Sequence, residues 1–464
     1  MKNKFLLTIA AVAALSLGSC SFFEVEDVPD LNNPTVESVL TNATKVQVNQ
    51  LAIGVQESLR NGQYSASWSG GSIGREVVFF NKTDNRYYTE LQGQVAIDPG
   101  GIFYPWYISF NSERRRAEIF LQSANGSREL STAEKKGVEG FAKTAQAYTM
   151  LTCLNMMGKE GIRTEFSDLL APGDLLKPGP MSNYESGLAY CRKLVDDGGA
   201  ALDAAGTAFS FPITSGWGAN FDTPAEFKKF NRAVAARVAM YQKDWAAMNS
   251  ALSASYLNLA GSLTDGPNFT FSTTIGDARN PWFSNKNEAT APICPQSKFI
   301  AEAEAGDDRV FGAGVSDGGK AKIRQRTSSA SLGGFPEALF EISLVPTNIS
   351  PMPIIRNEEL ILMYAEAQIQ TSNLGEGEKA LDIIREAHAL PKIAVAKPTI
   401  VGNKDALIDE LLTQRRYSLF MEGRHRWFDM RRYNKLGSLP LDLPTHKVFD
   451  NFPKKQTEVD WDGQ

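Results

Sequence analysis

Apolar residues recur at intervals of three and four along much of this chain, and long stretches without a clear period separate them. Side chains spaced in this way share one face of a helix, so the pattern predicts amphipathic helices that pack against each other. The predicted helices cover residues 35–59, 111–123, 131–157, 184–202, 224–241, 247–259, 354–370 and 376–390, followed by a helical stretch within 411–432. The hydrophobic pattern therefore predicts a mainly α protein.

Local signals set several helix ends. Ser131 and Glu134 have the spacing of a capping box, in which each side chain binds the other residue's backbone amide. Pro224 suits the first turn of a helix, where its missing amide hydrogen costs nothing. Asn61-Gly62 and Gly158 are expected to end the helices before them.

Three segments interrupt the helical pattern, near residues 61–110, 206–222 and 261–350. Eleven of the fifty residues in 61–110 are aromatic, against 10% of the whole chain, and Gly70-Gly71 and Pro99-Gly100-Gly101 divide it. We expect long structured loops there, with one or two short helices. Short strands are expected near 269–273 and 340–344.

The first 34 residues are predicted to direct export. Lys2 and Lys4 precede an apolar run at 5–15, which is too short to span a membrane. Leu17-Gly18-Ser19-Cys20 resembles a bacterial lipobox, which implies a lipoprotein signal peptide at 1–19 and lipidation of Cys20. Residues 20–34, with Pro29 and Pro34, then form an acidic tether. The alternative is an ordinary cleaved signal peptide.

Charge and cysteine content exclude several classes of protein. The net charge of −5 argues against nucleic-acid binding, which requires a basic surface. No CxxC pair or Cys/His cluster is present, so no metal site is expected. A disulfide between Cys153 and Cys191 stays open. No catalytic motif such as HExxH, GxSxG or a P-loop occurs, and no cofactor is expected.

The stretch 411–432 (LLTQRRYSLFMEGRHRWFDMRR), here called the signature segment, combines apolar residues with six arginines. A buried unpaired charge costs several kcal/mol, so the arginines need partners. Glu422 and Asp429 lie within the segment, and Glu358, Glu359 and Glu366 lie on the preceding helix. Gly423 is expected to end one helix through a left-handed turn. His425 is expected to be structural.

Within the signature segment, Arg415-Arg416, Phe420-Met421-Glu422-Gly423 and His425-Arg426-Trp427-Phe428-Asp429-Met430-Arg431 resemble the C-terminal motif of the SusD/RagB family. Separately, two helix pairs, around Asp244-Trp245 and at 354–390, resemble tetratricopeptide units. Together these resemblances imply tetratricopeptide-like helix pairs in an α/α superhelix. Residues 35–464 would form a single domain, with long loop-rich insertions that carry a few short strands.

The family resemblance implies a surface-exposed, lipid-anchored outer-membrane protein. It would capture an oligosaccharide or polysaccharide for import through a partner TonB-dependent transporter of the SusC type, without catalysing a reaction. The alternatives are the same role with a peptide as cargo, a lipid-tethered carbohydrate-active enzyme, and a helical-repeat scaffold with no small-molecule site. The identity of the cargo is not encoded in a readable motif.

Loop residues with aromatic, amide and charged side chains are the candidate ligand contacts. A sugar presents C–H faces that stack on aromatic rings and hydroxyl groups that bind planar polar groups. The candidate residues share these properties and lie in the irregular segments: Trp68, Asp84, Asn85, Arg86, Tyr88, Trp217 and Trp282. Each tryptophan can alternatively serve to pack its loop onto the helices.

Overall fold

The computed structural model describes residues 36–166, 178–218 and 220–462. The predicted signal peptide (1–19) and the tether with Cys20 (20–34) lie outside the described residues. Most of the described chain is helical, which confirms the mainly α prediction. Among the described residues, no helix combines the length and the apolar character needed to cross a membrane.

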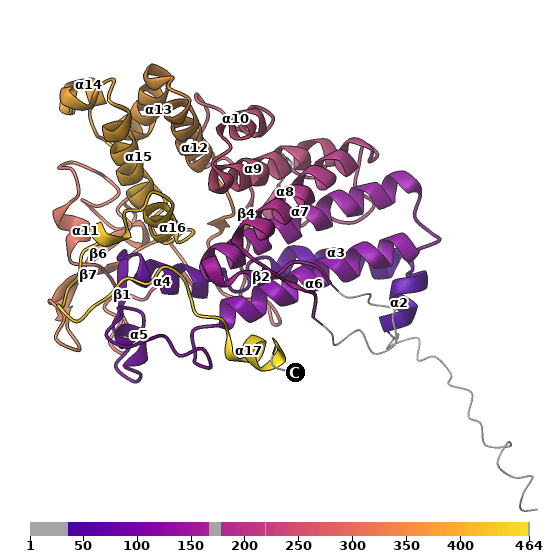
Figure 1. Ribbon diagram of the computed structural model, residues 1–464, viewed down its shortest axis with the longest axis horizontal. Coiled ribbons are helices and arrows are strands. Elements are labelled where there is room, and N and C mark those ends of the chain that lie inside the picture. The colour runs from indigo at the N-terminus through magenta and orange to yellow at the C-terminus, as the bar shows by residue number, and fades with distance from the viewer. Residues whose placement is uncertain (1–35, 167–177, 219, 463–464) are drawn as a thin grey trace, which may run out of the picture.

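The N-terminal helices form one group (Figure 1). These helices are α2 (Val36–Asn42), α3 (Lys45–Ser58), α6 (Pro105–Gly126), α7 (Thr132–Met157), α8 (Tyr184–Asp203), α9 (Pro224–Gln242) and α10 (Trp245–Ser253). In this group α2 and α3 pack on α6, and each helix from α6 to α10 packs against the next. The predicted helix at 35–59 is interrupted because Thr44 and Gln47 form a capping box that starts α3. The predicted helix at 247–259 ends earlier, at Ser253.

Two predicted helix starts are confirmed. The Ser131 hydroxyl accepts a hydrogen bond from the Glu134 amide, and the Glu134 carboxylate accepts one from the Ser131 amide. Pro224 occupies the first turn of α9. Gly158 follows α7 with φ of 53°, a conformation that favours glycine.

The C-terminal helices form a second group, which contacts the first through α9, α10 and α12. Its main helices are α12 (Asn357–Gln370), α13 (Leu374–Ala387), α15 (Lys404–Ser418) and α16 (His425–Arg432). Shorter helices are α4 (Gln63–Ile73), α5 (Arg86–Thr89), α11 (Lys298–Ala301), α14 (Ile393–Ala396) and α17 (Gln456–Asp462).

The strands of the described residues form four antiparallel pairs: β1 (Val77–Phe79) with β5 (Ile293–Pro295), β2 (Ile162–Arg163) with β3 (Met181–Ser182), β4 (Asn268–Phe269) with β8 (Met352–Pro353), and β6 (Ile323–Ala330) with β7 (Ala338–Ile342). The β1–β5 pair joins the aromatic segment 61–110 to the distant segment 261–350. The two predicted strands overlap β4 and β7.

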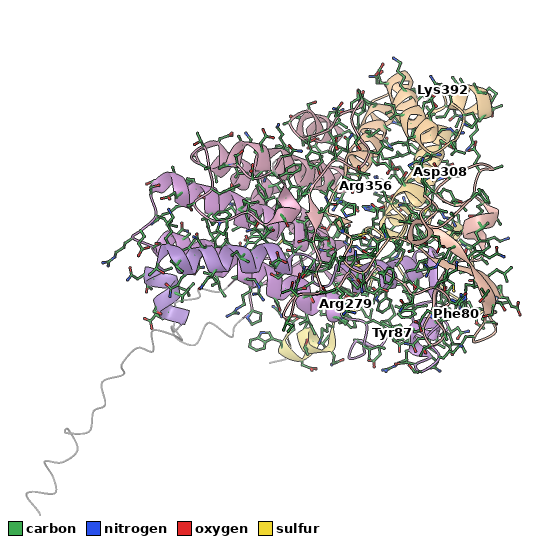
Figure 2. The ribbon with its side chains drawn as sticks, turned by 180° about the vertical axis from the view of Figure 1, so that it is seen from behind. Phe80, Tyr87, Arg279, Asp308, Arg356 and Lys392 are labelled. Carbon is green, nitrogen blue, oxygen red and sulfur yellow. The ribbon has the colours of Figure 1, made fainter. Side chains whose placement is uncertain are left out.

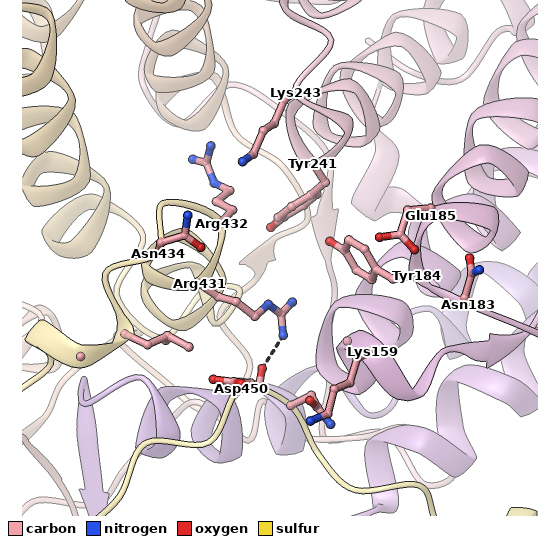
Figure 3. A pocket seen from close by; sticks show the side chains of 14 residues that line it. Lys159, Asn183, Tyr184, Glu185, Tyr241, Lys243, Arg431, Arg432, Asn434 and Asp450 are labelled. Atoms are coloured by element: carbon pink, nitrogen blue, oxygen red, sulfur yellow. Dashed lines mark hydrogen bonds between the residues drawn. The ribbon is translucent and has the colours of Figure 1, made fainter.

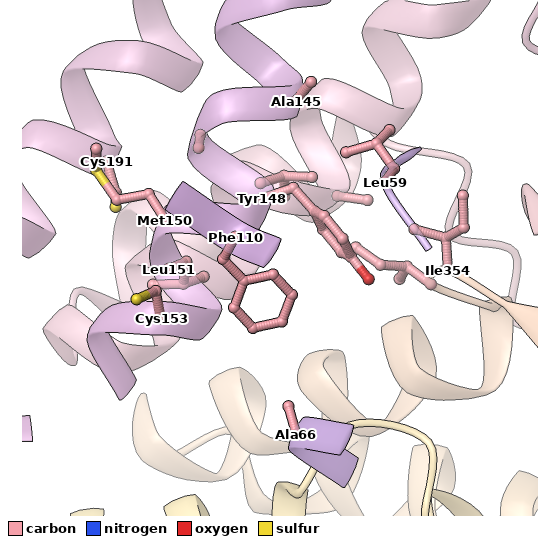
Figure 4. Packing of buried hydrophobic residues seen from close by; sticks show 14 of the residues in the cluster. Leu59, Ala66, Phe110, Ala145, Tyr148, Met150, Leu151, Cys153, Cys191 and Ile354 are labelled. Atoms are coloured by element: carbon pink, nitrogen blue, oxygen red, sulfur yellow. The ribbon is translucent and has the colours of Figure 1, made fainter. Parts of the chain in front are cut away.

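The largest core cluster joins α3, α4, α6, α7, α8 and α9. Figure 4 shows part of it, where Phe110 and Leu151 pack beneath Tyr148. Cys153 and Cys191 lie in this core as buried free thiols, and Cys294 is also free and buried. The disulfide that the sequence left open is therefore not formed in this structure.

The signature segment is buried between α12, α4 and the N-terminal helices. The Arg415 guanidinium binds the Asp429 carboxylate at 2.7 Å, and Arg432 binds both Asp429 and Glu366. Arg416 binds Glu302 instead of the acids expected from sequence. Breaking one such buried pair costs about 3–5 kcal/mol, so these contacts hold the segment in place.

Other features of the segment differ from expectation. Glu358, Glu359 and Glu422 pair with cations outside it, chiefly Arg356 and Arg237. The prediction for Gly423 is wrong, because the left-handed conformations lie at Met421 and Arg424. Gly423 is required for a different reason: a Cβ there would lie 2.4 Å from Nε2 of His425.

The predicted loop at Gly70-Gly71 is instead the middle of α4. A Cβ at Gly70 would lie 2.7 Å from Cβ of Arg424, and one at Gly74 would lie 2.8 Å from Cβ of Trp427. Glycine therefore serves close packing of α4 against the signature segment and not flexibility. This contact fixes the position of the side chains that α4 presents on its other faces.

Candidate functional site

Five rings make up the aromatic surface, defined here as Tyr64 and Trp68 of α4, Phe79 of β1, Tyr87 of α5 and Phe103 from the turn before α6. The Trp68 ring lies 5.3 Å from Phe79, 5.2 Å from Tyr87 and 6.0 Å from Phe103 between centroids. Phe79 and Tyr87 meet edge to face at 4.7 Å. Such pairs contribute about 0.5–1.5 kcal/mol each beyond burial, so the rings hold one another in place.

Exposure divides these five rings into two sets. Trp68 is 7% exposed and Phe103 is fully buried, whereas Tyr64, Phe79 and Tyr87 are half-buried. The hydroxyl of Tyr87 makes no hydrogen bond to another described residue. The half-buried rings can therefore contact a ligand, and the buried rings support them. Figure 2 shows Tyr87 near the lower edge of the molecule, with Phe80 close by.

Charged and amide groups accompany Tyr87 on α5. The Arg86 guanidinium donates to both carboxylate oxygens of Asp84, with the shortest distance 2.7 Å. This hydrogen bonding lowers the pKa of Asp84. Asn85 is exposed, and its side chain makes no hydrogen bond to another described residue. The α5 region therefore offers an amide and a fixed ion pair beside the rings.

The signature segment is connected to the aromatic surface through Trp282. Nε1 of Trp282 donates to the carbonyl of Met421 at 3.0 Å, and the Trp282 ring meets Tyr64 edge to face at 5.4 Å. Trp282 is only 1% exposed. It links the loop before β5 to the signature segment and braces Tyr64.

The structure brings together only some of the residues predicted from sequence. Asp84, Asn85 and Arg86 lie together beside the aromatic surface, and Trp68 lies beneath it on a helix instead of a loop.

Three further predicted residues lie elsewhere. Tyr88 points into a separate cluster, where its ring meets Phe335 at 5.9 Å. Trp217 and Trp282 are 3% and 1% exposed, so neither offers a free ring face. Burial leaves these two rings without a free face for stacking, and the ligand contacts predicted from sequence stay predictions.

Sequence reasoning missed Tyr64, Phe79 and Tyr87. The alternation of side chains along β1 could have separated Phe79 from Phe80. Val77 and Phe79 pack on the main core, whereas Val78 and Phe80 pack in the separate cluster around Phe335. The choice between Tyr87 and Tyr88 depends on tertiary packing of the four-residue helix α5, which no local pattern encodes.

Trp217 lines a separate hollow of about 430 Å³. Its ring meets those of Phe141 and Phe230 edge to face and that of Phe227 at a tilt, and its Nε1 makes no hydrogen bond to another described residue. Exposed amides, among them Asn258, form part of the rim.

A larger hollow of about 670 Å³ lies between the ends of α7, α8, α9 and α16 (Figure 3). Lys159, Lys243, Arg431 and Arg432 bring four positive charges to its wall, and Glu185 and Asp450 bring two negative ones. We call this hollow the basic pocket. It shares no lining residue with the aromatic surface.

His425 is buried near Glu359, and its pKa lies well below the usual value because of burial and the surrounding arginines. A neutral, packed imidazole agrees with the structural role expected for it. Within 36–166, 178–218 and 220–462, no group of three or more His, Cys, Asp or Glu side chains is arranged to hold a metal ion.

Comparison with known proteins identifies relatives. The model of the SusD family matches residues 339–463, which include the signature segment. A SusD-like protein of Formosa agariphila is 34% identical over 97 residues, a match that covers 19% of each chain. Thus this similarity spans only about a fifth of that relative.

Solved structures extend the likeness to nearly the whole fold. Surface glycan-binding protein A from Bacteroides uniformis aligns with a TM-score of 0.66 at 15% identity, covering 90% of this chain and 98% of that one. A laminarin-binding SusD-like protein aligns with a TM-score of 0.62 at 14% identity, covering 89% of this chain and 97% of that one. A SusD superfamily protein from Bacteroides vulgatus aligns with a TM-score of 0.62 at 15% identity, covering 90% of this chain and 97% of that one. At this identity the structural likeness shows the fold alone.

Proposed function

We propose that this chain, whose residues 339–463 match the model of the SusD family, is a surface-exposed, lipid-anchored protein that captures glycans. It binds an oligosaccharide or polysaccharide and delivers it to a partner TonB-dependent transporter of the SusC type in the outer membrane. It performs no chemistry on the ligand.

The observation that carries this proposal is the aromatic surface. Half-buried rings held at fixed angles offer flat apolar faces to the C–H face of a sugar, and little entropy is lost because the rings are already ordered. Asn85, Asp84 and Arg86 provide groups for hydroxyls at the edge. An open surface suits a long polymer, which can extend beyond both ends of the contact.

The relatives support the same ligand class. Two of the similar structures are described as binding glycans, one as a surface glycan-binding protein and one as laminarin-binding. The Asp84 carboxylate is held by Arg86 and its pKa is lowered, so it stays ionised and can accept hydrogen bonds from sugar hydroxyls.

The membrane anchor is proposed from the sequence around Cys20. More than one acyl chain is needed for stable anchoring, since each buried CH₂ contributes about 0.8 kcal/mol. Replacing Cys20 by alanine should release the protein from the membrane fraction. Retention of the variant in that fraction would contradict lipid anchoring at this residue.

Calorimetric titration with a panel of neutral oligosaccharides tests the binding proposal. Tyr87→Ala should weaken binding at least about tenfold, which is the loss of about 1.4 kcal/mol expected for one stacked ring. Tyr190→Ala is the matched control, because Tyr190 is half-buried on α8, away from the aromatic surface. Equal losses in both variants, or binding of peptides alone, would overturn the proposal.

A further inference from the structure

The basic pocket is the largest hollow described above, and it is built from helix ends that are distant in sequence. Lys159 follows α7, Tyr184 begins α8, Tyr241 and Lys243 lie at the end of α9, and Arg431 lies on α16. In Figure 3 Arg431, Tyr184 and Tyr241 point toward the middle of the hollow, and the two lysines approach from opposite sides. Its volume of about 670 Å³ lies within the usual range for small-molecule sites.

Only some of the positive charges on the pocket wall form ion pairs with carboxylates. Arg432 is paired with Glu366 and Asp429, outside the hollow. Arg431 instead donates to two backbone carbonyls, those of Asp450 and Asn155, each at 2.7 Å. Its guanidinium also lies 5.9 Å above the Tyr184 ring. Burial lowers the pKa of Arg431, as expected for a cation that lacks a close carboxylate.

The two lysines are also without ion pairs. Lys159 and Lys243 are exposed, and neither makes a salt bridge to a described residue. Lys243 follows α9 in a left-handed conformation with φ of 58°. Elsewhere on α8 and α9 lysines meet acids, as Lys193 meets Asp197 and Lys228 meets Asp203. The pocket therefore has three cationic groups available to an anion.

The remaining wall explains which anion fits. Glu185 and Asp450 would repel a compact multivalent anion such as phosphate, but carboxylates and amides readily accept or donate hydrogen bonds to hydroxyls. Asn434 is exposed and makes no side-chain hydrogen bond to another described residue. No strand edge lines the hollow, so an extended peptide would find no backbone pairing.

We propose that the basic pocket binds a short acidic saccharide, whose carboxylate or sulfate group contacts Arg431, Lys159 and Lys243 while its hydroxyl groups bind Glu185, Asp450 and the amides. The inference rests on the proposed function only in taking the ligand to be a saccharide. It assigns a second site, independent of the aromatic surface.

Titration of the purified protein with four probes tests this site. The probes are trigalacturonate, a sulfated trisaccharide, neutral maltotriose and triglutamate. We expect at least one acidic saccharide to bind, with an affinity that falls as salt screens the charges. The carboxylate and sulfate probes distinguish the two possible acidic groups.

Matched charge variants locate the binding. The double change Lys159→Gln and Lys243→Gln should weaken acidic-saccharide binding at least about tenfold. The control Lys193→Gln and Lys228→Gln removes the same charge from lysines of α8 and α9 outside the pocket and should change that affinity less than about twofold. Melting temperatures should stay equal in all three proteins, since these lysines are on the surface.

The outcomes separate the two proposals. The pocket assignment is overturned if neither acidic saccharide binds, if both double variants lose affinity equally, or if only triglutamate depends on Lys159 and Lys243. Neutral-saccharide binding that requires Tyr87 would then leave the proposed function intact. If acidic-saccharide affinity is unchanged in Tyr87→Ala but falls when the two lysines are replaced, the pocket assignment is supported even if neutral saccharides do not bind at the aromatic surface.

Discussion

The aromatic surface and the basic pocket differ in almost every physical respect. The first is an open set of rings with one fixed ion pair, and the second is a hollow in which three of four cations lack an acidic partner among the described residues. Yet the signature segment contacts both: the Met421 carbonyl holds Trp282 beneath Tyr64, and Arg431 forms part of the pocket wall. The difference teaches that one rigid segment can support two binding chemistries.

Removing Trp427 should break both regions together. This side chain is fully buried, its Nε1 donates to the Phe449 carbonyl at 2.8 Å, and it packs against Gly74. Trp427→Ala should lower the free energy of unfolding by about 3–5 kcal/mol. Denaturant titration measures this, with the exposed Trp461→Ala as control. Normal stability with loss of only one ligand class would show that Trp427 acts locally.

Gly74→Ala should separate the two regions. The new Cβ would lie 2.8 Å from Cβ of Trp427, so α4 must shift at a cost of about 1–3 kcal/mol. Binding at the aromatic surface should weaken more than binding in the basic pocket, because α4 carries Tyr64 and Trp68 but lines no part of the pocket. Gly206→Ala serves as the control, since its nearest neighbour would be 3.9 Å away. Equal loss at both sites would contradict this separation.

The buried carboxylate of Glu76 should make the free energy of unfolding depend on pH. Its carboxylate is buried without a hydrogen bond, and burial raises its pKa to about 8. The folded state therefore holds this proton while the unfolded state loses it near pH 4.5, and the contribution to stability is lost as pH rises toward 8. Relative to wild type, Glu76→Gln should gain on the order of 3 kcal/mol in unfolding free energy between pH 5 and pH 8.

Unfolding free energies at four pH values between 5 and 8 test this expectation. The difference between variant and wild type should grow steadily with pH. Parallel curves for the two proteins would show that Glu76 is ionised in the folded state. Acidic-saccharide binding should stay nearly constant over the same range, because lysines and arginines keep their charge there.

The smallest expected effect is the coupling between the two regions. Tyr87→Ala combined with the changes at Lys159 and Lys243 should give losses for each ligand that add within about 0.3–0.5 kcal/mol. Calorimetry of the triple variant measures this sum. A larger deviation would mean that one extended ligand spans both regions.

Sequence patterns predicted the helices and their ends better than the binding regions. The capping box at Ser131 and the proline at 224 are local signals, and both act where they were expected. Gly70-Gly71 looked like a flexible loop because close packing against a segment some 350 residues away leaves no local mark. Trp217 and Trp282 were candidate ligand contacts with loop packing as the alternative, and the sequence could not decide between these roles because only tertiary contacts bury the two rings.

The candidate site was only half predictable. Asp84, Asn85 and Arg86 form a polar cluster within three residues, and the structure keeps them beside the half-buried rings. The basic pocket could not be foreseen, because Lys159, Lys243 and Arg431 come from separate helix ends. Three arginines of the signature segment were correctly expected to meet acids, but which acid each one meets is decided by the packing of whole helices.

The glycine contacts of α4 have a dynamic consequence. At Gly70 and Gly74 no side chain of α4 separates its backbone from Arg424 and Trp427, so the two helices lack a deformable layer between them. Local opening of α4 must then disturb α16. Hydrogen exchange of backbone amides in α16 should accordingly slow when a saccharide occupies the rings around Tyr64, although no atom of that ligand touches α16.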